Sequence, residues 1–118
     1  MKKLLGTSVL VAALLSASAL ALEQGPFTAE QARSGRALYV ANCAACHGPE
    51  LKGAGEAPPL AGGTFMAAWG NRSTNEFYNL IKNSMPYGNG NSLDPIVYKN
   101  IVASILSING ATPGNNPF

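Results

Sequence analysis

The residues best suited to chemistry form one string of five, Cys43-Ala44-Ala45-Cys46-His47. Two thiols separated by two residues can form thioether bonds to the two vinyl groups of one haem. The histidine that follows can bind the iron from the same side. This C-x-x-C-H spacing therefore predicts a covalently attached haem c, with His47 as an axial ligand of its iron.

The same cysteines have three other possible uses. A redox dithiol is expected within a βαβ pattern, which the chain does not show. A zinc site needs four ligands, and the chain has two cysteines and one histidine, so a carboxylate would have to be the fourth. A plain disulfide would suit an oxidising compartment. Haem attachment accounts for the whole string, including the histidine, and is the favoured interpretation.

The second axial ligand of the iron would be a further histidine or a soft donor such as methionine. No second histidine exists, and two methionines, Met66 and Met85, follow the motif. Met85 is the candidate, because it lies far enough beyond His47 for the chain to pass round a haem, and Pro86 stiffens the backbone after it. Met66 is expected to pack, and core packing is also the alternative for Met85. A Met/His pair favours reduced iron, and with both axial positions filled it suits outer-sphere electron transfer.

The N-terminus has the pattern of a secretory signal. Lys2 and Lys3 precede an apolar stretch, and Ala19-Leu20-Ala21 is a small-x-small cleavage site. We expect a cleaved signal peptide over residues 1–21 and a periplasmic protein. A retained membrane anchor is the alternative, but the stretch is marginal for spanning a bilayer, so the mature chain is expected to have no membrane span.

Residues 22–118 are long enough for one small domain, with a loose C-terminal tail after about residue 110. The chain has eight Lys and Arg residues, of which two belong to the predicted signal, and six Asp and Glu residues, so the mature chain would be formally neutral. A nucleic-acid partner needs a clustered basic face and is therefore not expected.

Hydrophobic periodicity predicts helices and no convincing strand. Thr28 with Gln31 and Ser73 with Glu76 have capping-box spacing, and Asp94-Pro95 has the pattern of a helix start. Residues 48–64 are rich in glycine and proline and predict an ordered loop. The predicted helical segments are 28–42, 64–69, 73–84 and 95–108, and the predicted apolar stripes of the last two are Phe77, Leu80 and Ile81, and Val97, Ile101, Ile105 and Ile108.

Across these elements the chain resembles the class I cytochromes c, in particular the small bacterial single-haem type. The pattern is close to the single-haem domains that accompany periplasmic quinoprotein alcohol dehydrogenases and related oxidases. The resemblance implies an all-α cytochrome c fold, with three to five short helices around the haem. The matching residues are Gly35-x-x-x-Tyr39-x-x-x-Cys43-x-x-Cys46-His47-Gly48, Ala57-Pro58-Pro59-Leu60-x-Gly62, Phe65, Trp69, Met85-Pro86 and Asn109-Gly110.

The resemblance also implies roles for individual residues. A carbonyl of the Pro58-Pro59 loop would accept a hydrogen bond from the His47 ring, which would orient the imidazole and raise its basicity. Four side chains would pack on the haem, namely Leu60, Phe65, Trp69 and Tyr87. The indole N–H of Trp69 would also be available to a haem propionate.

One departure from the family lies in the last helix. The first and last helices of the family cross near the residue equivalent to Gly35, usually with an aromatic side chain packed there. This chain has Ser104 at that position, with Tyr98, Ile101 and Ile105 nearby in the sequence.

The implied function is that of a periplasmic electron carrier whose haem iron cycles between Fe(III) and Fe(II). It would take single electrons from a dehydrogenase or another redox partner and pass them to an oxidase, as a monomer or as a subunit of a dehydrogenase complex. It would not itself be an enzyme. The alternatives are a peroxidase-like haem enzyme, for which no distal base stands out, and a gas or redox sensor in which Met85 dissociates.

Overall fold

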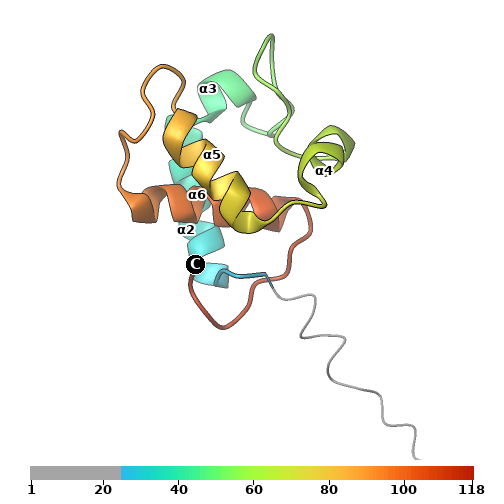
Figure 1. The fold of residues 1–118 in the computed structure, drawn as a ribbon, viewed down its shortest axis with the longest axis vertical. Coiled ribbons are helices and arrows are strands. Elements are labelled where there is room, and N and C mark those ends of the chain that lie inside the picture. The colour runs from blue at the N-terminus through green and yellow to red at the C-terminus, as the bar shows by residue number, and fades with distance from the viewer. Residues whose placement is uncertain (1–24) are drawn as a thin grey trace, which may run out of the picture.

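The computed structural model describes residues 25–118, which form five helices and no strand (Figure 1). The all-α prediction is therefore confirmed for this part of the chain. No helix within it is both long and apolar enough to cross a bilayer. The predicted signal peptide lies outside the described residues. The helices are α2 (Ala29–Asn42), α3 (Ala44–His47), α4 (Gly63–Trp69), α5 (Thr74–Ser84) and α6 (Pro95–Ile108).

The longer helices begin where the capping residues predict. Thr28 Oγ1 accepts from the Gln31 amide and Gln31 Oε1 accepts from the Thr28 amide, both at 3.2 Å, which completes the capping box of α2. Ser73 Oγ accepts from the Glu76 amide at 3.1 Å at the start of α5. Asp94 is the N-cap of α6 without a side-chain capping bond, and the start of that helix instead relies on proline at its first position.

α2 and α6 cross with their backbones in close contact, and Gly35 makes this possible. A Cβ atom on Gly35 would lie 1.7 Å from the carbonyl oxygen of Asn100 and 3.0 Å from the Cβ of Ser104. No side chain fits at that distance, so glycine is required at the crossing. The crossing that the family resemblance implies is thus present, with buried Ser104 beside Gly35.

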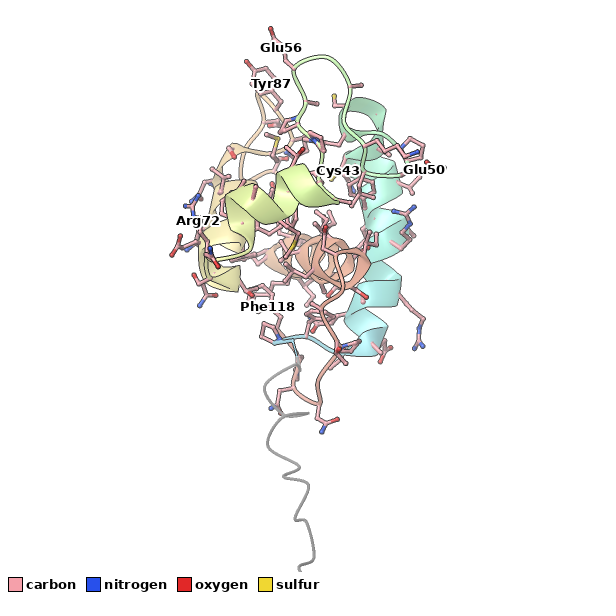
Figure 2. The ribbon with its side chains drawn as sticks, turned by 90° about the vertical axis from the view of Figure 1, so that its right-hand side faces the viewer. Cys43, Glu50, Glu56, Arg72, Tyr87 and Phe118 are labelled. Carbon is pink, nitrogen blue, oxygen red and sulfur yellow. The ribbon has the colours of Figure 1, made fainter. Side chains whose placement is uncertain are left out.

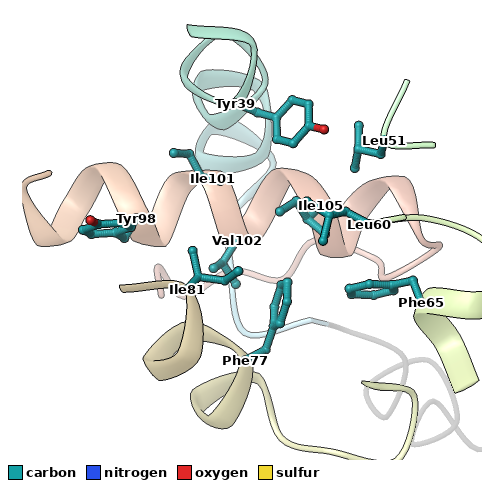
Figure 3. Packing of buried hydrophobic residues seen from close by; sticks show 10 residues of the cluster. All are labelled: Tyr39, Leu51, Leu60, Phe65, Phe77, Ile81, Tyr98, Ile101, Val102 and Ile105. Carbon is teal, nitrogen blue, oxygen red and sulfur yellow. The ribbon is translucent and has the colours of Figure 1, made fainter. Parts of the chain in front are cut away.

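α6 runs through the middle of the core, between α2 on one side and α5 on the other (Figure 3). The Phe77 ring of α5 packs against the rings of Phe65 and Trp69 of α4, with centroid distances of 5.3 and 4.9 Å. These aromatic contacts fasten α4 and α5 together beside α6. The buried apolar cluster consists of Tyr39, Leu51, Leu60, Phe65, Phe77, Ile81, Tyr98, Ile101, Val102 and Ile105.

Three apolar residues expected inside are exposed. Leu80 lies beyond the α5 face that buries Phe77 and Ile81, and Ile108 lies at the exposed end of α6. Met66 belongs to a helix of seven residues that buries only Phe65. A helix buries one stripe, and residues at the edge of that stripe stay in solvent even when they are apolar. The predicted packing of these three side chains is therefore corrected.

The C-terminal tail, predicted to be loose, is held against the start of α2. Gln31 Oε1 accepts from the Phe118 amide at 2.7 Å, and Gln31 Nε2 donates to the Phe118 carbonyl at 3.2 Å. The Gly114 amide donates to the Phe27 carbonyl at 2.7 Å, and the Phe118 ring packs edge-on against Tyr78. The tail is ordered because a buried glutamine and an aromatic contact anchor it.

Ser104 borders a groove beside the crossing of α2 and α6. The groove has a volume of about 350 Å³ and is bordered by small side chains, among them Ala32, Ser104 and Ser107. Because a larger side chain has room there, we expect Ser104→Tyr to leave the free energy of unfolding unchanged or to raise it. Urea unfolding of the holoprotein measures this, with Ser104→Ala as the control for loss of the hydroxyl. A loss of more than about 1 kcal/mol would indicate overpacking at the crossing.

Candidate haem site

One cavity of about 790 Å³ lies between the cysteine motif and the residues around Met85. Its wall is mostly apolar, which suits a large flat cofactor. Glu56 and Tyr87 border it at the same end of the molecule (Figure 2). Its lining residues include Cys43, Cys46, His47, Pro58, Leu60, Ile81, Met85, Tyr87, Leu93, Tyr98, Ile101 and Ile105.

The cysteine motif reaches the cavity through a break between two helices. α2 ends at Asn42, Cys43 has a non-helical backbone, and α3 then adds a single turn that ends at His47. The hydroxyl of buried Tyr39 donates to the Gly48 carbonyl at 2.6 Å and so ties α2 to the end of the motif. Burial raises the pKa of Tyr39 to about 12, so this hydroxyl keeps its proton at neutral pH.

His47 is buried and oriented by a backbone group. Its Nδ1 lies 2.8 Å from the carbonyl oxygen of Pro58. Because a carbonyl only accepts, Nδ1 carries the proton and the lone pair is on Nε2, the nitrogen left to bind a metal. This is the hydrogen bond that the family resemblance implies, and such a bond fixes the ring and raises its basicity.

The surroundings of Cys43 do not favour a redox dithiol, and the site does not provide the ligand cluster that zinc needs. Burial, with a smaller contribution from Cys46, raises the pKa of the Cys43 thiol to about 11. A disulfide-exchanging cysteine needs a lowered pKa instead, because the thiolate is the nucleophile. Zinc binding needs a cluster of ligands, and residues 25–118 contain no group of three or more His, Cys, Asp or Glu side chains that could hold a metal.

Met85 caps the C-terminal end of α5 and lines the same cavity as His47. Its amide donates to the Ile81 carbonyl at 2.9 Å, and its carbonyl accepts from the Tyr98 hydroxyl at 2.6 Å. The other candidate, Met66, is 46% exposed and does not border the cavity. The fold thus brings one methionine to the site and leaves the other in solvent.

Some of the remaining predicted site residues line the cavity and others do not. Pro58 and Leu60 line the cavity, whereas Pro59 does not. Phe65 and Trp69 also lie outside its wall, because their rings pack on Phe77. The guanidinium of Arg72 lies 4.1 Å from the Trp69 ring centroid. Tyr87 borders the cavity but is 89% exposed, which places it at the mouth.

Two residues to which the sequence analysis gave no role at the site, Tyr98 and Asn109, hold the loops of the site to α6. Tyr98 bonds to the Met85 carbonyl, as described above. At the other end of α6, Asn109 Nδ2 donates to the carbonyls of Leu60 and Ile105 at 2.9 and 2.8 Å, and Asn109 Oδ1 accepts from the Gly62 amide at 3.0 Å. The available signal for Tyr98 is a tyrosine in a helix rich in apolar residues, since a buried hydroxyl needs a partner.

Replacing Asn109 by alanine is expected to lower the free energy of unfolding of the holoprotein by about 2 kcal/mol, because three side-chain hydrogen bonds are lost at a partly buried position. Urea unfolding measures the change. Exposed Asn115 gives a matched control, and Asn115→Ala should alter stability by less than about 0.5 kcal/mol. Equal effects of the two substitutions would show that Asn109 does not fasten the loop.

These residues fit a covalent haem c. Two thiols, one histidine nitrogen with a free lone pair and one thioether border a single apolar cavity. The two thiols would form the thioether bonds to the haem, and the Met85 thioether is a soft donor of the type found in haem proteins with Met/His ligation.

Comparison with known proteins places these residues within a known family. The family model described as "Cytochrome C oxidase, cbb3-type, subunit III" matches residues 30–105. Among solved structures, the sulfane dehydrogenase SoxCD from Paracoccus pantotrophus contains a chain similar in fold, with 28% sequence identity and a TM-score of 0.58. The match covers 74% of this chain and 46% of that chain, so this chain spans less than half of its length. No curated protein sequence matches.

The family match covers the cysteine motif, Met85 and nearly all of α6. It therefore extends over both sides of the cavity rather than over the motif alone. The chain accordingly belongs to this cbb3-type subunit III family of cytochrome c domains, and its cofactor is a covalently bound haem c.

Proposed function

We propose that this protein is a periplasmic carrier of single electrons between a dehydrogenase donor and an oxidase acceptor. The function of electron transfer follows from the family. The observation that best supports a carrier rather than an enzyme is that His47 and Met85 border the same cavity. If His47 and Met85 both bound the iron, no position at the metal would remain for a substrate.

We assign the haem attachment to Cys43 and Cys46 and the axial ligands to His47 and Met85. Bound haem supplies a one-electron couple between Fe(III) and Fe(II). The Pro58 carbonyl keeps the His47 ring in one orientation, so this ligand does not have to reorganise when the charge changes. The apolar wall from Leu60, Ile101 and Ile105 excludes water and favours the reduced form.

The ionisable groups of the cavity also support a role other than catalysis. A haem enzyme needs an acid–base group close to its substrate. Of the described lining residues, Glu56 and Tyr87 are exposed near the mouth. His47 is committed to Pro58, and the Tyr98 hydroxyl is committed to Met85. None of them is a free proton donor inside the cavity.

The carrier proposal is tested on the purified holoprotein. We expect a low-spin ferrous spectrum that carbon monoxide does not change, and a reversible redox titration with one electron per haem. Rapid binding of carbon monoxide together with peroxidase turnover would contradict the proposal.

Affinity purification from native periplasm then identifies the donor and the acceptor, and absence of the protein from the periplasm would refute the assigned compartment.

The charge balance predicts how the carrier docks. If the signal peptide is cleaved, the remaining polypeptide has equal numbers of acidic and basic residues. Electrostatic steering should therefore be weak, and the rate of reduction by the donor should change by less than about threefold between low and physiological salt. Stopped-flow reduction over a range of ionic strength measures this. A steep loss of rate with salt would show a charged docking face.

A further inference from the structure

Tyr98 holds both ends of the segment 85–93 with one hydroxyl. The side chain is 1% exposed and lies in the first part of α6. Its hydroxyl donates to the Met85 carbonyl at 2.6 Å and accepts from the amides of Ser92 and Leu93 at 3.2 and 3.4 Å. A single hydroxyl has one donor and two acceptor positions, and all three are used here.

The other hydrogen bonds of this segment do not reach α6. The Asn91 amide donates to the Lys82 carbonyl at 2.8 Å, which ties the segment to α5, and the Asn89 amide donates to the Pro86 carbonyl at 2.7 Å within it. Among the described residues, the Tyr98 hydroxyl makes the only side-chain hydrogen bonds between α6 and this segment. Movement of the Met85 backbone away from α6 must therefore break the bond to its carbonyl, and opening of the whole segment must break all three.

The ring of Tyr98 has a separate role from its hydroxyl. Tyr98 lines the haem cavity together with Met85, Leu93 and Ile101. Phenylalanine at this position would keep the apolar wall and remove only the hydroxyl. The effect of the three hydrogen bonds can thus be measured without opening the cavity.

We propose that Tyr98 is a positioning residue that keeps the Met85 thioether in the haem cavity and so limits the dissociation of this ligand. The inference rests on the proposed ligation by Met85. When the segment 85–93 opens, the protein changes from a state in which Met85 is bound to the iron to an open state. An external ligand binds only the open state. The three hydrogen bonds exist only in the closed state, so removing the Tyr98 hydroxyl destabilises the closed state alone. The population of the open state therefore rises.

Carbon monoxide binding to the ferrous holoprotein measures the open population. We expect Tyr98→Phe to increase the binding rate at least about tenfold, because the net loss of even one of the three buried hydrogen bonds has an effect of this size. Tyr39→Phe is the matched control. Tyr39 is equally buried, and its hydroxyl donates to the Gly48 carbonyl at the same distance of 2.6 Å, but on the His47 side of the cavity. This variant should change the rate by less than about twofold.

The outcomes separate the inference from the proposed function. One outcome would overturn the role of Tyr98 and leave the carrier proposal standing. In it, Tyr98→Phe binds carbon monoxide no faster than Tyr39→Phe, and the unmodified protein shows the ferric sulfur-to-iron charge-transfer band. Rapid binding by the unmodified protein would overturn ligation by Met85, and the inference with it. Because phenylalanine keeps the buried ring, both variants are expected to fold, and urea unfolding verifies this.

Discussion

Replacing Met85 by alanine is expected to remove the ferric sulfur-to-iron charge-transfer band and to lower the midpoint potential. Of the methionines in residues 25–118, Met85 borders the cavity with His47 and Met66 does not. A neutral thioether stabilises reduced iron, so its loss should lower the potential by on the order of 0.2 V, a fraction of the roughly 0.8 V over which axial ligands set haem potentials. Visible spectroscopy and a redox titration of the holoprotein measure both effects.

Met66→Ala is the matched control for this experiment. Met66 is 46% exposed and lies outside the cavity. The same change of residue type there should leave the band and the potential unaltered. If Met85→Ala kept the band, the upper ligand would be another group, and the assignment of Met85 would be incorrect.

Replacing Gly35 by alanine is expected to destabilise the holoprotein by about 3 kcal/mol or more. The added methyl group would lie 1.7 Å from the Asn100 carbonyl oxygen, which belongs to the α6 backbone and cannot rotate away. α2 and α6 would have to separate, and with them the contacts of the core. Urea unfolding, followed by haem absorbance and by far-UV circular dichroism, measures the loss.

Gly63→Ala serves as its control. Gly63 is the first residue of α4, and a Cβ atom there has no neighbour within 4 Å. Alanine at this helical position should be neutral or stabilising by less than about 1 kcal/mol. A Gly35→Ala protein as stable as Gly63→Ala would mean that the two helices do not cross at Gly35 in solution.

Much of the architecture follows from local signals. The capping box at Thr28 and Gln31, the Ser73 cap and the Asp94-Pro95 pair locate three helix starts, because each depends on residues adjacent in the sequence. The haem motif is equally local, since its spacing alone brings two thiols and one imidazole together.

What the sequence could not give depends on contacts between distant segments. Gln31 meets Phe118 and Tyr98 meets Met85 only after folding, so neither the anchored tail nor the fastened loop is visible in a local pattern. Leu80 is apolar and close to the buried stripe, yet exposed, because the neighbouring helix decides where that stripe ends. The contacts of the Phe65 and Trp69 rings with Phe77 join two helices and are likewise not visible in a local pattern.

α6 fastens the methionine segment through Tyr98 near its start and the Pro58–Gly62 segment through Asn109 at its end. One rigid helix therefore connects the segments that hold His47 and Met85, the two proposed iron ligands. Local openings on the two sides should then belong to one cooperative unit. Amide hydrogen exchange at Leu93 and at Gly62 should accordingly accelerate together when α6 is destabilised from either end, so that the two faces of the haem lose their protection in a single step.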